Sequence, residues 1–387
     1  MQAKFTPLLA ATAALILTAV SAQASPASYH ISLLPQDRSY SAFNDLGQAV
    51  SGTQLYDSRS GTFTTLVTAP AGWSMNLLGL NNAGDAYGVM GNGTQLLNFV
   101  YHDGAVRSFA SQTVISYHPI SGLPYYAYTT PTGINNSGEL AVQWYSSLFN
   151  DTFSGRMDVA TGAVITQKSG LYGALSDNGN MAVMRGNQVN LIDANGQIQY
   201  LPYQGLIARA LNDEGQLAGS IGNNGFVYDD GVLTSFRNDT TQYDAQGQVI
   251  RGVVGGSVQV GGINELGQVV GKQGTLGSGL GYLYSDGEFQ YLNDLTNLVD
   301  GWNIVDATSI NELGQISAKA CKTQNVSAVW TDCASVLLVP DALTQPVPEP
   351  QTAALLVAGL GALAWVRRRV RPSNPSTPSS PTHPDGA

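Results

Sequence analysis

The sequence predicts an all-β fold, a β-propeller of seven four-stranded blades, followed by one C-terminal hydrophobic helix. Two observations favour this fold. A short turn phrase occurs seven times along the chain, and a second turn phrase alternates with it. Charged residues make up only 11% of the chain while Gly reaches 44 residues, a composition typical of short strands and tight turns rather than helices.

Residues 1–24 have the features of a signal peptide. Lys4 supplies a positive charge, residues 8–20 form an apolar core, and Ala22-Gln23-Ala24 is a small-x-small cleavage site. We expect cleavage after Ala24 and export of the following chain.

The first turn phrase consists of an apolar residue, Asn, two variable residues, Gly and a polar residue. The Asn side chain caps the turn, and Gly takes the left-handed position that closes a type I turn with a bulge, so each copy predicts a β-hairpin. The fourth copy has Ser in place of Asn. The copies are residues 43–48, 80–85, 134–139, 175–180, 211–216, 263–268 and 310–315.

The second turn phrase has Asp-Gly or Asn-Gly near its centre and predicts another hairpin. Clear copies are residues 101–106, 192–197, 228–233 and 284–289, and weaker copies are 56–63, 157–164 and 330–336. Two hairpins in each repeat make four strands. Seven repeats over residues 25–350 give about 47 residues each, the size of a propeller blade. An extra hairpin at 243–248 would make eight blades, and six blades with an insertion fit the same spacing.

The two phrases resemble the HAF repeats of bacterial extracellular proteins, in which an apolar-Asn-x-x-Gly-Gln-Val-Val-Gly pattern precedes an aromatic-Asp-Gly turn. The resemblance covers about residues 29–340; it implies a β-propeller and carries no catalytic residue. We predict one domain over residues 25–340, in which the surplus strand at 29–34 completes the last blade.

The only two cysteines, Cys321 and Cys333, lie in the predicted last blade. In an oxidising compartment this pair predicts a disulfide between adjacent strands. The bond would hold the ring together where its two ends meet.

The C-terminal region has three parts in order, the first of which lies in a linker at residues 341–351. Pro348-Glu349-Pro350 is followed by an apolar run at 352–366 and then by Arg367-Arg368-Arg369. As a helix the run would be about 22 Å long, against the ~30 Å of a bilayer core, so it predicts a marginal membrane span. The arginines, which open a Pro/Ser-rich tail at 367–387, would remain on the cytoplasmic side.

This region resembles the PEP-CTERM sorting signal of Gram-negative bacteria that make extracellular polysaccharide. The resemblance implies an exosortase-like sorting enzyme, a membrane-embedded cysteine transpeptidase, as a partner. We expect a precursor held in the inner membrane by this helix and then released to the cell surface or extracellular matrix. A permanent single-span anchor is the alternative.

Composition excludes several classes of partner. Residues 25–350 carry a formal charge of about −14. This charge argues against nucleic acid and against anionic lipid surfaces.

We predict no catalytic residue, metal site or cofactor. The four histidines are His30, His102, His118 and His383, and no HExxH, GxSxG or phosphate-binding loop motif occurs. The acidic pairs at 213–214 and 229–230 are expected to be polar turn residues, with Ca²⁺ binding as the weaker alternative.

One segment departs from the repeats. Residues 114–131 contain aromatic side chains among prolines, which suit stacking on sugar rings. Packing of these rings between blades is the alternative. The candidate ligand-binding residues are Tyr117, His118, Tyr125, Tyr126 and Tyr128.

These features predict a non-catalytic, exported module that binds extracellular polysaccharide or a surface partner, and not an enzyme. One alternative is a polysaccharide lyase or glycosidase, which needs paired carboxylates facing one channel. The other is a purely structural coat protein.

Overall fold

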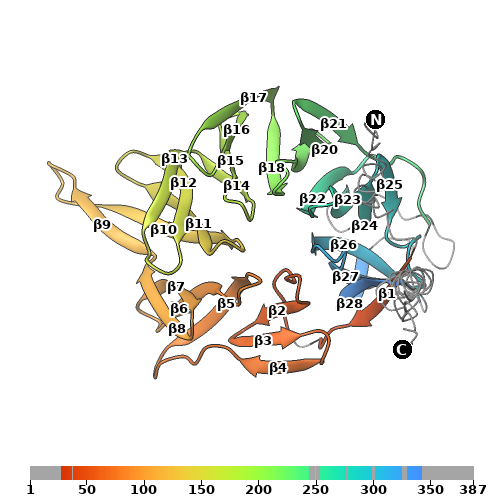
Figure 1. Cartoon of the computed structure of the whole chain (residues 1–387), viewed down its shortest axis with the longest axis horizontal. Coiled ribbons are helices and arrows are strands. Elements are labelled where there is room, and N and C mark those ends of the chain that lie inside the picture. Colours follow the sequence, from red (N-terminus) through yellow and green to blue (C-terminus); the bar gives the residue numbers. More distant parts are fainter. Residues whose placement is uncertain are drawn as a thin grey trace, which may run out of the picture. The chain divides into compact units, whose positions relative to one another are not determined.

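Seven antiparallel sheets follow one another along the chain and form the blades of a β-propeller in the computed structural model (Figure 1). The structure describes residues 28–36, 38–243, 249, 253–275, 278–298, 301–324 and 329–341. The predicted signal peptide with Ala24, the Pro348-Glu349-Pro350 motif, the helix at 352–366 and the tail with Arg367–Arg369 lie outside the described residues. No helix in the described part of the chain is long and apolar enough to cross a membrane.

Blades 1 to 3 differ from one another in strand number. Blade 1 contains β2 (Gln48–Ser51), β3 (Gln54–Asp57) and β4 (Thr62–Thr65). Blade 2 contains β5 (Ser74–Leu80), β6 (Ala86–Gly91), β7 (Leu96–His102) and β8 (Ala105–Ala110). Blade 3 contains β9 (Gln112–Tyr117), β10 (Pro124–Ile134), β11 (Glu139–Ser146), β12 (Asp151–Asp158) and β13 (Val164–Ser169).

Blades 4 to 7 each have four strands. Blade 4 contains β14 (Leu171–Leu175), β15 (Met181–Arg185), β16 (Gln188–Ile192) and β17 (Ile198–Gln204). Blade 5 contains β18 (Leu206–Leu211), β19 (Leu217–Ile221), β20 (Asn224–Asp229) and β21 (Val232–Phe236). Blade 6 contains β22 (Ser257–Ile263), β23 (Val269–Thr275), β24 (Ser278–Ser285) and β25 (Glu288–Tyr291). Blade 7 contains β26 (Trp302–Ile310), β27 (Ile316–Gln324), β28 (Val329–Pro340) and β1 (Tyr29–Leu33).

The prediction of seven blades is confirmed, whereas four strands in every blade is wrong for blades 1 and 3. In blade 1 the innermost position is taken by an irregular segment, in which Ser41 exchanges hydrogen bonds with Val50: its N–H donates to the Val50 carbonyl and its Oγ accepts from the Val50 N–H. In blade 3, β9 adds a fifth strand. The extra hairpin predicted at 243–248 makes no blade: a single antiparallel bridge joins Tyr243 to Val249, and the residues between them lie outside the description.

The N-terminal strand closes the ring. β1 pairs antiparallel with β28, from Tyr29 opposite Pro340 to Leu33 opposite Val336. This pairing confirms that the surplus strand completes the last blade. The hairpin predicted at residues 330–336 is wrong, because these residues belong to β28, and the edge position it would fill is occupied by β1.

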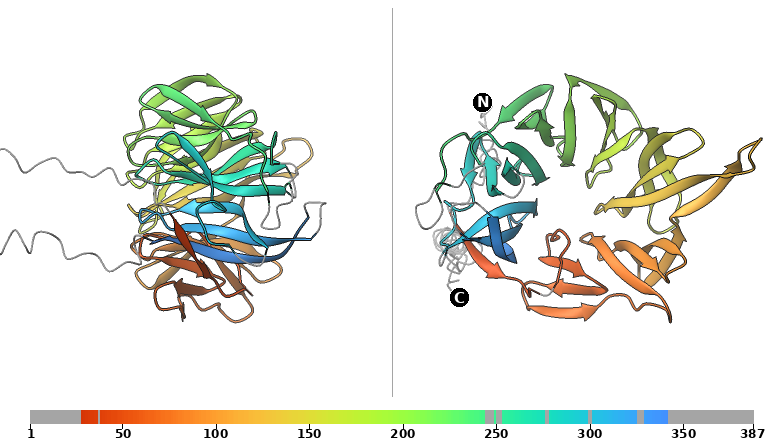
Figure 2. Two further views of the ribbon diagram at one scale, coloured as in Figure 1. Left: turned by 90° about the vertical axis from the view of Figure 1, so that its right-hand side faces the viewer. Right: turned by 180° about the vertical axis from the view of Figure 1, so that it is seen from behind.

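Cys321 and Cys333 form a disulfide across β27 and β28, with a Cα–Cα distance of 4.1 Å. The bond therefore lies inside blade 7, where the first and last strands of the propeller meet. Figure 2 shows this blade from two further directions.

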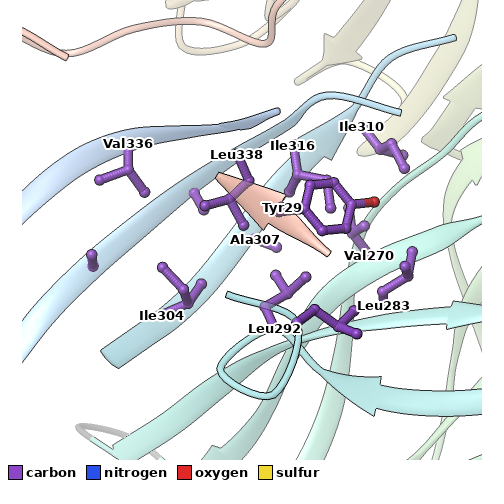
Figure 3. Packing of buried hydrophobic residues seen from close by; sticks show 13 residues of the cluster. Tyr29, Val270, Leu283, Leu292, Ile304, Ala307, Ile310, Ile316, Val336 and Leu338 are labelled. Carbon is purple, nitrogen blue, oxygen red and sulfur yellow. The ribbon is translucent and has the colours of Figure 1, made fainter. Parts of the chain in front are cut away.

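Apolar side chains fill the space between neighbouring blades. The cluster between blades 6 and 7 is a clear example, with Tyr29 of β1 inserted among side chains of both blades (Figure 3). Burial of such apolar surface provides the main favourable free energy of folding. The buried residues labelled in Figure 3 are Tyr29, Val270, Leu283, Leu292, Ile304, Ala307, Ile310, Ile316, Val336 and Leu338.

Three blades have a Gly within their second strand, and the residues that face these glycines explain why. Gly88, Gly219 and Gly271 lie directly opposite Phe99, Phe226 and Tyr282 on the next strand. A Cβ at any of these glycines would come within 2.9 Å of the facing aromatic side chain and within 2.2 Å of a main-chain carbonyl oxygen of the first strand. The glycine therefore makes room for an aromatic ring that packs into the blade.

Candidate functional site

The asparagines of the first turn phrase link each blade to the next. In six of the seven turns the Asn Oδ1 accepts the N–H of the residue four positions later. Its Nδ2 donates to the main-chain carbonyl of the matching residue in the following blade, at 2.9 to 3.2 Å. We call this series of bonds the asparagine belt. Its last bond runs from Asn311 in blade 7 to the carbonyl of Asn44 in blade 1, which is 267 residues away in the sequence. The six residues are Asn44, Asn81, Asn135, Asn212, Asn264 and Asn311.

The fourth turn has Ser176 and reaches its neighbour differently. Asn178 donates to the Asp213 side chain from its N–H and to the Asp213 carbonyl from its Nδ2. The junction between blades 4 and 5, which lacks the phrase Asn, is thus linked through Asn178 and Asp213 instead. The preceding junction, between blades 3 and 4, has a charged contact beside its Asn135 link: buried Arg156 of blade 3 pairs with Glu139 at 2.7 Å and donates to the Ala194 carbonyl of blade 4.

A second belt lies one residue further along each turn. The side-chain oxygen of this residue accepts a main-chain N–H from the preceding blade, at distances such as 2.9 Å for Asp213 to Glu265, 2.8 Å for Glu265 to Glu312 and 2.8 Å for Glu312 to Asp45. Five of its members are carboxylates, so acidic groups from five blades meet around one end of the propeller axis. The belt residues are Asp45, Asn82, Asn136, Asp177, Asp213, Glu265 and Glu312.

The crowding of these carboxylates changes their protonation. Partial burial raises the pKa of Glu312 to about 7, and the charges of Glu265, Asp45 and Asp177 act in the same direction. Burial also raises the pKa of Asp177 and of Glu265 above the usual range, opposed in each case by the N–H that the carboxylate accepts. Glu312 is therefore only partly ionised near neutral pH.

The acidic belt is a feature that the sequence predictions do not include. Of its five carboxylates, only Asp213 belongs to the acidic pairs that the sequence singles out, and there its neighbour is Glu214. The signal that would have found the belt is positional: the residue after each phrase Asn occupies the same place in every blade. Of the described residues, no three His, Cys, Asp or Glu side chains are grouped so as to hold a metal ion.

The predicted ligand-binding residues all lie on one hairpin, β9–β10, which extends outward from blade 3 (Figure 1). The hairpin turn is held by His118, whose Nδ1 accepts the N–H groups of Ile120 and Ser121. This contact gives His118 a structural role. Tyr117 and Ile120 are 63% and 91% exposed, so the outer end of the hairpin is open to solvent.

The aromatic side chains of this hairpin are divided between its two faces. Tyr126 and Tyr128 lie on one face with Tyr145 of β11, with successive ring centroids 6.1 Å apart. On the other face, the ring of Tyr125 contacts that of His118 at 5.9 Å. The structure thus brings two of the five predicted residues into one row and adds Tyr145, which the sequence pattern did not select.

Comparison with known proteins identifies the tail. Residues 346–371 match the PEP-CTERM protein-sorting motif. This match contains Pro348-Glu349-Pro350, the apolar run and Arg367–Arg369. Such signals indicate export and surface sorting in Gram-negative bacteria, with processing by an exosortase-type enzyme. A comparison with curated proteins gave no match.

Several solved structures resemble the propeller. A prolyl endopeptidase is 11% identical, with a TM-score of 0.40, over 81% of this chain and 50% of its own. The acylaminoacyl peptidase of Pyrococcus horikoshii is 12% identical, with a TM-score of 0.37, over 72% and 45%. A gluconolactonase of Xanthomonas campestris is 12% identical, with a TM-score of 0.26, over 50% and 69%. The chain spans about half the length of the two peptidases.

Proposed function

We propose that this protein is an exported, non-catalytic propeller that binds extracellular polysaccharide through the β9–β10 hairpin. Export and sorting rest on the PEP-CTERM motif. HAF-type repeats and a precursor held in the inner membrane by residues 352–366 are parts of the same proposal.

One observation carries the binding role. Tyr126 and Tyr128 of the projecting hairpin form a row with Tyr145 of the adjacent strand β11. Flat rings with a polar edge offer sugar rings both apolar stacking and hydrogen bonds. A row of rings suits a polymer, because successive weak contacts on one chain add to its apparent affinity.

The test uses purified residues 25–346 and the extracellular polysaccharide of the native host. Size-exclusion chromatography, with and without Ca²⁺, should show co-elution with unchanged polymer length. Tyr128→Ala should weaken binding by about three- to tenfold, the value of one aromatic contact. Tyr200→Ala on β17 is the control, since Tyr200 is an exposed Tyr outside the hairpin, at 63% against 40% for Tyr128. Equal effects of the two substitutions would refute a specific role for the hairpin.

A second candidate is a polysaccharide lyase or glycosidase, and the axial carboxylates are the observation in its favour. Glu312, with a pKa of about 7, suits a general acid beside the carboxylate of Glu265. Progressive shortening of the polymer in the same experiment, abolished by Glu312→Gln, would support the enzyme and replace the binding proposal.

A further inference from the structure

The outer strand of the projecting hairpin has an open hydrogen-bonding edge. β9 is the end strand of its five-stranded sheet and pairs with β10 on one side only. Thr113, Val114 and Ile115 are exposed side chains on this strand. An edge strand of this kind presents unpaired N–H and C=O groups to any strand that can approach it.

This edge lacks the features that usually prevent strand addition. Natural edge strands carry charged side chains or Pro, or are covered. The opposite edge of the same blade and the outer edges of the two neighbouring blades follow this rule, with Lys168 in β13, Arg107 in β8 and Pro202 in β17. β9 has neither a charge nor a Pro, and its sequence is QTVISY.

The charge distribution favours a second copy of the same chain as the occupant. The exported part carries about −14, so two copies repel each other over most of their surfaces. Residues 108–138 contain no Asp, Glu, Lys or Arg, and they include the whole hairpin. This segment also exposes Ile120 and Leu123 at its turn, at 91% and 66%. Two copies can therefore approach at this hairpin without bringing like charges together.

We propose that the protein forms a two-fold symmetric dimer in which the β9 strands of two copies pair antiparallel. An antiparallel edge is complementary to its own copy about a two-fold axis, so the contact closes with two subunits and does not extend into a fibre. The two blade 3 sheets become one sheet, and the aromatic rows of both copies lie on it. The dimer does not depend on polysaccharide binding, although it would place two binding faces on one assembly.

The test is light scattering coupled to size-exclusion chromatography on residues 25–346, loaded at about 1 to 100 µM. The wild type should change from monomer to dimer within this series. Thr113→Asp should raise the dimer dissociation constant at least tenfold, because Asp disfavours strands and adds a negative charge to each of the two paired strands. Thr113 pairs with Ala127, on the face away from Tyr126 and Tyr128, so this change leaves the aromatic row intact.

The matched control is Thr234→Asp, which makes the same change at an exposed position of β21 and should leave the dimer unchanged. Amide hydrogen exchange of residues 112–117 gives an independent readout, and protection should increase with protein concentration. A wild type that stays monomeric throughout the series overturns the proposal, as does a dimer in which Thr113→Asp has no effect. The Thr113→Asp monomer should still bind the polysaccharide. The proposed dimer and the proposed polysaccharide site are therefore tested separately.

Discussion

At the scale of single residues, each turn asparagine makes a set of hydrogen bonds that no other side chain can reproduce. Asn264 is fully buried; its Oδ1 accepts from Gln268 N–H, and its Nδ2 donates to the Gln268 side chain and to the Asn311 carbonyl. Asp cannot donate, and Gln is too long to keep the turn. The Asn therefore defines both the shape of its own turn and the position of the next blade.

Asn264→Ala should lower the free energy of unfolding by about 2–4 kcal/mol, because it leaves a buried N–H and a buried carbonyl without partners. Urea unfolding monitored by fluorescence would measure the change. Asn195→Ala is the control: Asn195 is exposed in another turn, and its loss should cost less than about 0.5 kcal/mol. Equal costs at the two positions would contradict the role of the belt.

Glu312 makes stability depend on pH. Its pKa is about 7 in the folded protein and near 4.5 when unfolded, so the folded state binds the proton more tightly between these values. The resulting stabilisation is complete below pH 4.5 and is lost as the pH rises through 7. Glu312→Gln removes the titration while keeping an oxygen to accept the Glu265 N–H.

The variant should therefore gain stability relative to the wild type as the pH rises from 4.5 to 8. Melting temperatures across this range would measure the gain. Glu288→Gln on β25 is the exposed control and should give a constant difference. If the difference in melting temperature between Glu312→Gln and the wild type were also constant with pH, the acidic belt would not raise the pKa of Glu312.

At the scale of elements, blade 7 differs from the others because its strands come from both ends of the propeller. β1 is attached by its pairing with β28, by the Tyr29 side chain in the core and by a hydrogen bond from the Tyr29 N–H to the Leu295 carbonyl. The disulfide of β27 and β28 holds together the two strands on which β1 depends. Blade 7 is therefore the natural place for a covalent bond.

Replacing both Cys321 and Cys333 with Ser should lower the free energy of unfolding by about 3 kcal/mol, the value expected for a short loop closed by a disulfide. Guanidinium unfolding with and without reductant would test this value. Reductant should weaken the wild type and leave the double variant unchanged. If full reduction of the disulfide left the stability of the wild type unchanged, pairing of β1 would be sufficient to close the ring without it.

At the scale of the whole molecule, repetition made the propeller predictable. The Asn and Gly of each turn are local signals, so seven copies gave the blade count, and the strand left over at 29–34 gave the closure. The strand numbers of blades 1 and 3 could not be predicted from the repeats. In blade 1 an irregular segment takes the place of a strand and is held by the main chain and the side chain of Ser41, and in blade 3 β9 is a strand outside the repeat. The acidic belt needs the ring itself, because carboxylates such as Asp45 and Glu312 become neighbours only on closure.

The belt of turn asparagines has a consequence for how such a ring can grow or shrink. Every link runs in the same direction, from the Asn side chain of one blade to the main-chain carbonyl of the next. A blade added by duplication would bring both the donor and the acceptor that its new neighbours require. The polar contacts between the turns can therefore form with any number of blades. The packing of apolar side chains between blades must be what limits the ring to seven.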